Sequence, residues 1–195
     1  MEVGPLSRIL VAASDGQDDI GAALASVLTT LGMGTEDLLS TIGRVIARAV
    51  EAQVIVRQLG AWHEQLVANL ATGDLAVADV TRWDPSTWPP TAEGWSLGES
   101  SRGAVGHWLS IRDGRIEHYE IVDATTWNAS PRDRTGWRGA IETALPGTPV
   151  ADPARPLEIL RTVHSFDPCT ACAVHEFDPA GGGVPIAVSV REGRP

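Results

Sequence analysis

The chain has 195 residues but only two cysteines, and it has little of what marks secreted, membrane or nucleic-acid-binding proteins. Two cysteines three positions apart cannot crosslink a large fold, so a disulfide framework is excluded. No apolar run reaches about eighteen residues, and residues 1–6 lack the basic-then-apolar pattern of a secretion signal. We therefore expect no signal peptide in this chain, and a cytoplasmic location or a membrane association made through partner subunits.

Positive charge is also scarce, because 15 basic residues face 25 acidic ones and the net charge is -10. This argues against a nucleic-acid or anionic-membrane partner, since both bind clustered Lys and Arg. What is present is ordinary globular composition, with 43% hydrophobic and 21% charged residues. The length is sufficient for one sizeable core, so we expect a single folded unit rather than a disordered chain.

The first third of the chain has helical periodicity. Residues 18–31 predict one helix that ends at Gly32, and Thr35 is placed to cap a second, longer helix. Alternating spacings of four and three define an apolar seam along this second helix: Leu38, Ile42, Val45, Ala49, Ala52, Val56, Leu59, His63, Leu66 and Leu70. A seam of this length predicts that the helix packs against a large partner.

The rest of the chain predicts a smaller β part and short helices. Residues 73–101 contain three prolines and three tryptophans and are typical of a linker that wraps over the core. Strand-like segments at 104–111 and 116–122 flank Asp113-Gly114, a strong hairpin signal, and a loop is expected over 123–133. With short helices near 137–145 and 157–163, the fold class is α+β, mainly helical with one β-hairpin. These elements are too few to cover the seam, which indicates an incomplete core.

Both cysteines lie in one short motif, Cys169-Thr-Ala-Cys172, with His175 three residues further on. The pair is compatible with half a structural zinc site, a dithiol redox pair, two thiolates of a nickel, copper or iron centre, or two small buried apolar side chains. Zinc is disfavoured because no second ligand pair completes a tetrahedron, and the thioredoxin-like pattern places its motif early in a βαβ unit. We expect His63, His107 and His164 to be structural.

Six segments are informative together: residues 2–6, 102–108, 125–128, 130–133, 147–150 and 156–175, the last of which ends in Asp-Pro-Cys-x-x-Cys-x-x-His. They resemble one family, the large subunit of nickel-iron hydrogenases. The resemblance runs almost from end to end and corresponds to the C-terminal third of that subunit. It implies a catalytic subunit for the reversible heterolytic cleavage of dihydrogen to protons and electrons, a nickel-dependent hydrogenase.

The resemblance also implies the site residues. Cys169 matches a terminal nickel ligand and Cys172 a bridging ligand, which makes them two of four cysteines in a Ni-Fe centre whose iron carries CN and CO. Arg102 and Thr125 match residues that hydrogen-bond the cyanides, and Arg102 also matches a group that assists proton transfer. His175 and the backbone carbonyl of Ile121 match ligands of a magnesium ion.

The same resemblance divides the chain at residue 175. Residues 1–175 match the C-terminal part of the large-subunit domain, and residues 176–195 match an extension that a maturation endopeptidase removes after nickel loading. The implied partners are an iron-sulfur small subunit and the missing N-terminal part of the large subunit. Without the second Cys-x-x-Cys, the isolated chain is expected to be incomplete and inactive, and the alternative is a truncated, non-catalytic homologue that acts as an assembly or interaction module.

Two short stretches depart from the family pattern. Ser100-Ser101 stands where Ala-Pro usually precedes the arginine, and Asp123-Ala124 stands where Val-Pro usually precedes the threonine. The carboxylate of Asp123 would face the apolar surroundings of the iron. Since an unpaired buried carboxylate is costly, the pocket is altered, the loop turns, or the group is protonated or hydrogen-bonded.

Overall fold

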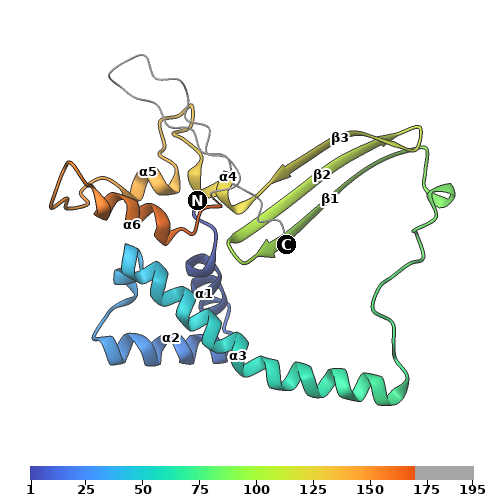
Figure 1. The fold of residues 1–195 in the computed structure, drawn as a ribbon, viewed down its shortest axis with the longest axis horizontal. Coiled ribbons are helices and arrows are strands. Elements are labelled where there is room, and N and C mark those ends of the chain that lie inside the picture. The colour runs from blue at the N-terminus through green and yellow to red at the C-terminus, as the bar shows by residue number, and fades with distance from the viewer. Residues whose placement is uncertain (170–195) are drawn as a thin grey trace, which may run out of the picture.

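The computed structural model describes residues 1–169, and the fold in this range combines helices with one antiparallel sheet (Figure 1). The elements in chain order are α1 (Pro5–Ser14), α2 (Asp18–Leu31), η1 (Thr35–Leu38), α3 (Thr41–Thr72), η2 (Pro85–Thr87), β1 (Thr91–Ser100), β2 (Gly103–Arg112), β3 (Arg115–Val122), α4 (Ala124–Ala129), α5 (Ala140–Ala144) and α6 (Leu157–Ser165). The predicted α+β class is confirmed.

The core lies where α1, α2 and η1 pack against the first half of α3. Its buried residues are Leu6, Ile9, Ala23, Leu24, Leu28, Leu38, Ala47 and Val50. Helix α1, which the sequence analysis did not predict, begins with Pro5, a residue whose missing N–H costs nothing in a first turn. Helix α2 has its predicted bounds and ends at Gly32, which adopts a left-handed conformation with φ of 64°.

The start of the long helix was predicted wrongly. Thr35 opens the short 3-10 helix η1, and the cap of α3 is Ser40, whose side chain accepts a hydrogen bond from the Gly43 N–H at 3.1 Å. Gly43 is required at this break, because a Cβ there would lie 2.2 Å from the carbonyl oxygen of Leu38. The two segments therefore cross at close backbone contact, which a continuous helix cannot do.

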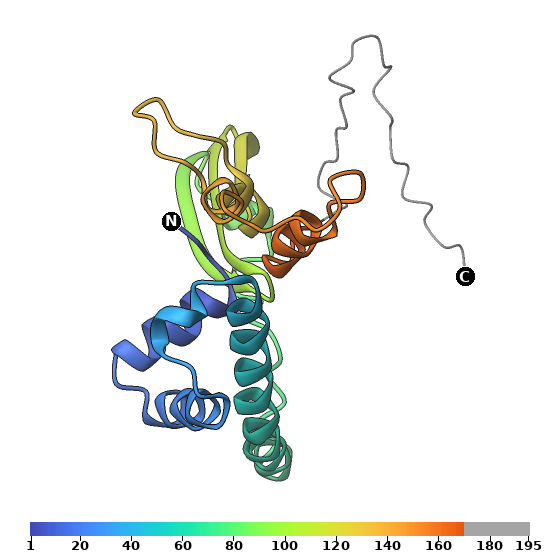
Figure 2. The same cartoon turned by 90° about the vertical axis from the view of Figure 1, so that its left-hand side faces the viewer.

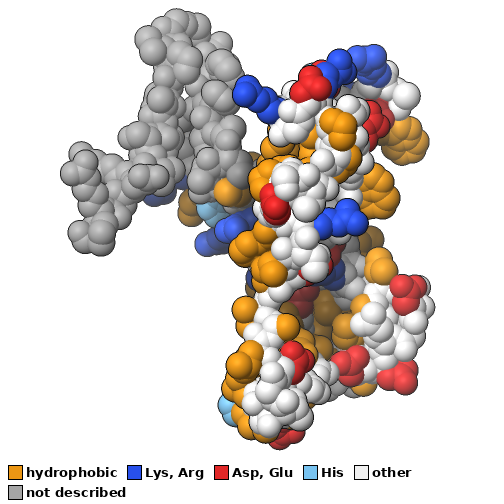
Figure 3. Space-filling view, turned by 90° about the vertical axis from the view of Figure 1, so that its right-hand side faces the viewer, with side chains coloured by type: hydrophobic (Ala, Val, Ile, Leu, Met, Phe, Trp, Pro, Cys, Tyr) orange, Lys and Arg blue, Asp and Glu red, His pale blue; other side chains and the backbone are white. Residues whose placement is uncertain are grey.

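The predicted apolar seam of α3 is not its buried face in this chain. The buried residues of α3 are Gly43, Arg44, Ala47 and Val50, whereas most of the seam is exposed, including Ile42, Val45, Val56, Leu59, Leu66 and Leu70. Figure 3 shows hydrophobic side chains at the surface in both the upper and the lower part of one face. The prediction that the seam needs a partner stands, but no segment within residues 1–169 covers it.

The β part is larger than the predicted hairpin. The hairpin itself is confirmed, with Asp113 and Gly114 both at positive φ in the turn between β2 and β3. Part of the predicted linker, however, is strand β1, which pairs antiparallel with β2 from Thr91↔Arg112 to Ser100↔Gly103. The sheet order is β1-β2-β3. Strand β1 was not predicted because it is almost wholly exposed, so its apolar residues do not form the alternating pattern of a half-buried strand.

The remaining helices, α4, α5 and α6, follow β3 in the chain. The predicted loop 123–133 begins with helix α4, a correction, and the predicted helices near 137–145 and 157–163 are α5 and α6 with shifted bounds. Figure 2 shows α1–α3 in one part of the molecule and the sheet with α4–α6 in the other. The N-terminal segment runs between the two parts.

Candidate metal centre

Three segments far apart in sequence meet where the sheet approaches α4 and the end of α6. Arg102 lies in the turn between β1 and β2, Thr125 lies in the first turn of α4, and Cys169 lies four residues beyond α6. A small depression between them is lined by Arg102, Ala124, Thr125, Asn128, Ala129, Ile141, Phe166, Asp167 and Pro168. The structure thus brings together three of the residues that the resemblance implies.

Thr125 contacts the cysteine segment directly. Its Oγ1 accepts a hydrogen bond from the backbone N–H of the half-buried Cys169 at 3.0 Å. A hydroxyl that accepts one hydrogen bond keeps its own proton to donate, so Thr125 can bind the cysteine backbone and an anion together. The contact joins residues 44 positions apart and fixes where the cysteine segment begins.

Asp123, a departure from the family pattern, holds α4 rather than lying unpaired in an apolar pocket. It is the N-cap of α4, and its Oδ1 accepts hydrogen bonds from Thr126 N–H at 2.7 Å and from Thr126 Oγ1 at 2.8 Å. Of the alternatives raised by the sequence, the hydrogen-bonded carboxylate is the one observed. A proline at position 124 would also be compatible with the first position of a helix, so α4 does not by itself distinguish Asp123-Ala124 from Val-Pro.

Asn128 fixes the other side of α4. Its side chain is 3% exposed, accepts a hydrogen bond from Val3 N–H at 2.9 Å and donates one to Val3 C=O at 2.9 Å. This pairing mimics a strand contact and ties α4 to the segment before α1. The sequence analysis quoted Asn128 in the family motif without giving it a role, and a buried amide in a six-residue helix has no periodic signal that would reveal one.

Arg102 faces an acidic neighbour that the sequence analysis did not single out. Its Nε lies 3.6 Å from Oδ2 of Asp167, and both side chains are more than 40% exposed. Among the residues described, the buried Nε of Arg102 has no hydrogen-bond partner. The signal for Asp167 was available, since it is the aspartate of Asp-Pro-Cys, and its φ of 52° shows a backbone held by its surroundings.

Two arginines on α3 contact the segment that leads to Cys169. The guanidinium of Arg44, 6% exposed as a residue, lies 3.8 Å from the ring centroid of Phe166 and forms two hydrogen bonds of 2.8 Å with Glu2. Arg48 donates to the carbonyl of Ser165 at 3.2 Å. These contacts set the direction in which the chain leaves α6.

Among the other predicted site residues, Ile121 does not line this depression. Ile121 lies near the end of β3, opposite His107, and Cys172 and His175 lie outside the described residues. His107 Nδ1 is 2.8 Å from the Tyr119 hydroxyl, while His63 and His164 are exposed. Within residues 1–169, no group of three or more His, Cys, Asp or Glu side chains is arranged to hold a metal ion.

Comparisons with known proteins agree on the family. The family model described as nickel-dependent hydrogenase matches residues 1–175, so the chain belongs to that family. It is 47% identical to the hydrogenase-1 large chain of Citrobacter freundii over 98% of its own length, and 46% identical to the uptake hydrogenase large subunit of Rhodobacter capsulatus over 93%. It matches the Ni-Fe-Se hydrogenase of D. vulgaris Hildenborough with a TM-score of 0.68 and 34% identity over 90% of its length.

The chain spans about a third of these relatives, namely 32% and 30% of the two large subunits and 35% of the solved chain. This agrees with the predicted C-terminal portion of the large-subunit fold. No helix in residues 1–169 is both long and apolar enough to cross a membrane.

Proposed function

We propose that the chain is the C-terminal part of a hydrogenase catalytic subunit and that it supplies two of the four cysteine ligands of a Ni-Fe centre. The observation that carries this proposal is the hydrogen bond of Cys169 N–H to Thr125 Oγ1, made beside Arg102. The hydrogen bond holds the backbone of Cys169 next to Pro168, which lines a depression together with Arg102 and Thr125. Membership of the nickel-dependent family supports the metal.

The residues present suit such a centre. Thiolates are soft donors that bind nickel and iron, and Cys169 and Cys172 are proposed as a terminal and a bridging ligand. The buried Arg102 Nε and the Thr125 hydroxyl are N–H and O–H donors suited to cyanide ligands on iron. His175 and the carbonyl of Ile121 are proposed as magnesium ligands, and residues 176–195 as an extension that an endopeptidase removes.

The bound Ni-Fe centre would supply the heterolytic cleavage of dihydrogen. This chain's residues would hold it and handle the proton. Sγ of Cys169 can receive a proton, and the guanidinium of Arg102 stabilises negative charge beside it while Asp167 limits the directions in which it can point. The electrons would leave through an iron-sulfur small subunit.

The test is metal content and turnover in the assembled complex. The chain is co-expressed with the N-terminal part of a large subunit, its small subunit and the maturation proteins, and nickel is measured by mass spectrometry. We expect about one nickel per complex and hydrogen-dependent dye reduction, both lost in Cys169→Ser. Thr148→Ala, away from the depression, is the control and should keep both.

The second candidate, a non-catalytic assembly or interaction module, is favoured by one observation. The chain has two cysteines, whereas the proposed Ni-Fe centre needs four. A complex that assembles stably with its partners but contains no nickel would support this candidate and reject the enzyme.

A further inference from the structure

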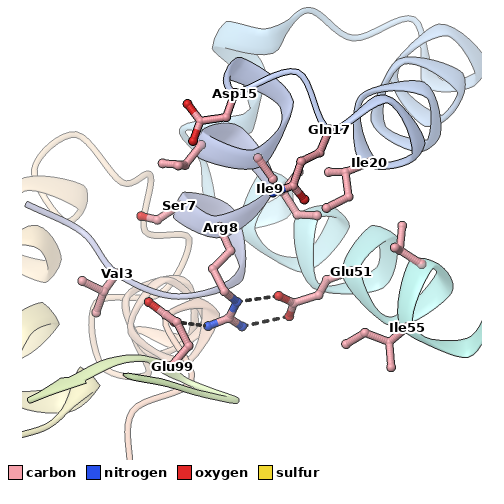
Figure 4. Close-up of a pocket in the computed structure, with 13 residues that line it drawn as sticks. Val3, Ser7, Arg8, Ile9, Asp15, Gln17, Ile20, Glu51, Ile55 and Glu99 are labelled. Carbon is pink, nitrogen blue, oxygen red and sulfur yellow. Dashed lines mark hydrogen bonds and ion pairs between the residues drawn. The ribbon is translucent and has the colours of Figure 1, made fainter. Parts of the chain in front are cut away.

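The turn that carries Arg102 is attached to the helical part of the molecule through the side chain of Arg8. Arg8 lies on α1, and Figure 4 shows its guanidinium between Glu51 on α3 and Glu99 on β1. Nε and Nη2 donate to the two carboxylate oxygens of Glu51, with the Nη2 contact at 2.9 Å, and Nη1 donates to Glu99 at 2.7 Å. Three elements thus converge on one cation.

The two remaining N–H groups of Arg8 bind the turn itself. Nη1 donates to the carbonyl of Ser100 at 2.9 Å and Nη2 donates to the carbonyl of Ser101 at 3.1 Å. A guanidinium has five N–H donors, and all five are used here. The two carbonyls belong to the residues immediately before Arg102, so the hydrogen bonds of Arg8 determine where the backbone of Arg102 begins.

The ion pair with Glu51 supports a fixed position for the Arg8 guanidinium. Hydrogen bonding to Glu51 raises the pKa of Arg8 above its ordinary value, so the group stays charged at any working pH. The side chains of Arg8 and Glu51 are 23% and 20% exposed, which shields this ion pair from solvent more than a surface pair. A planar fork bound at both edges has little rotational freedom, whereas a lysine would supply three donors at one point.

The backbone on the other side of the turn leaves no space for movement. A Cβ on Gly4 would lie 2.9 Å from the carbonyl oxygen of Arg102, and a Cβ on Gly103 would lie 2.8 Å from the Gly4 nitrogen. Both glycines have positive φ, of 125° and 140°. The turn therefore rests on the segment before α1 and is bound one helical turn later by Arg8.

We propose that Arg8 is a positioning residue, and that it acts through Arg102 by fixing the turn of residues 99–103 against α1 and α3. Arg8 lines a separate cavity of about 430 Å³ and does not line the depression beside Cys169. Its effect on turnover rests on the proposed function, while its effect on the turn does not.

The first test is hydrogen exchange in the full chain. In Arg8→Gln we expect the amides of residues 99–103 to exchange about tenfold faster than in the unchanged chain, with α2 unaffected. Arg8→Lys should show a smaller increase in the same residues. The control is Arg112→Gln, which removes an exposed ion pair with Glu117 at the opposite end of β2 and should leave residues 99–103 unchanged.

Two results would overturn the proposal. One is exchange in residues 99–103 within twofold of the unchanged chain, and the other is an equal increase across all elements. If Arg8→Gln does not fold, Arg8→Lys and Glu99→Gln decide by the same criterion, since Glu99 is 48% exposed and its loss removes only one contact of the cluster.

The second test asks whether Arg8 acts through Arg102 in the assembled complex. Turnover is measured for Arg8→Lys, Arg102→Lys and the double variant, each normalised to its nickel content. A positioning role predicts that the double variant is no slower than Arg102→Lys, because the target of the positioning is already lost. Losses that multiply would show an independent role and reject the proposal. A complex without turnover or nickel even before substitution would reject the proposed function, and the exchange test would then decide on Arg8 alone.

Discussion

The two halves of α3 have similar apolar content and opposite surroundings. In the inner half, residues 41–54, Ala47 and Val50 are at most 1% exposed against α1 and α2, and Arg44 and Arg48 contact the segment that leads to Cys169. In the outer half, residues 55–72, Leu59, Leu66 and Leu70 are all more than half exposed. Helical periodicity is thus present throughout, but burial occurs only where this chain supplies a partner. The inner half supports the candidate site, whereas no segment within residues 1–169 covers the outer half.

The largest effect should come from Arg44, which links the inner half of α3 to both ends of the described chain. Arg44→Leu leaves the carboxylate of Glu2 without its cation and removes the contact with Phe166. We expect the free energy of unfolding to fall by about 4 kcal/mol, because a shielded charge loses its partner. Urea denaturation of the full chain measures this. Arg112→Leu, in an exposed pair, should cost less than about 1 kcal/mol, and equal losses in the two variants would remove the distinction between the regions.

Matched leucine truncations test the same contrast for apolar side chains. Leu38 is 0% exposed where η1 meets α3, and Leu59 is 53% exposed in the outer half. Leu38→Ala should lower the free energy of unfolding by about 3 kcal/mol, since it opens a cavity, and Leu59→Ala should change it by less than about 0.5 kcal/mol. A large loss at Leu59 in the isolated chain would mean that the outer half is already covered, for example in a dimer, which sedimentation would detect.

The pattern of the fold was readable from the sequence where one physical signal was sufficient. Helix α2 and the β2–β3 hairpin were predicted because Gly32 and Asp113-Gly114 mark their ends and turn. Helix α1 and strand β1 were missed. Helix α1 has a helical period in Leu6, Ile9, Leu10 and Ala13 that the prediction overlooked. Strand β1 exposes almost every residue, so it has no buried face that a hydrophobic period could reveal.

The candidate site was predictable only as separate residues. The resemblance named Arg102, Thr125 and Cys169, and the structure shows their segments in contact. It could not reveal the contacts of Arg8 with the Ser100 and Ser101 carbonyls or of Asn128 with Val3, because these backbone groups lie about 90 and 125 positions away and a backbone partner leaves no mark on composition. The roles of all six predicted site residues, Arg102, Ile121, Thr125, Cys169, Cys172 and His175, stay predictions.

The contact between α4 and the N-terminal segment should have an intermediate effect. Asn128→Ala removes both hydrogen bonds to Val3 and leaves its partly buried backbone N–H and C=O unpaired. We expect a loss of about 2 kcal/mol in urea denaturation. Asn69→Ala in the outer half removes an exposed bond from Gln65 and should change the free energy by less than about 0.5 kcal/mol. A loss at Asn128 no greater than at Asn69 would show that α4 does not depend on this contact.

The smallest effect separates two aspartate caps of similar geometry. Asp123 caps α4 beside the candidate site, and Asp84 caps the exposed η2, accepting from Ser86 N–H at 2.9 Å. Asp123→Ala should cost about 1 kcal/mol, because α4 is packed and its unfolding exposes Ala124 and Asn128, whereas Asp84→Ala should leave global stability unchanged. The two variants are compared by urea denaturation, with hydrogen exchange at Thr126 and Ser86 as the local measure. Both caps should lose local protection, but only the loss at Asp123 should reach the midpoint of global unfolding. If both midpoints shift equally, the exposed segment around η2 unfolds together with the candidate site. The contrast between the packed and the exposed regions would then not extend to η2.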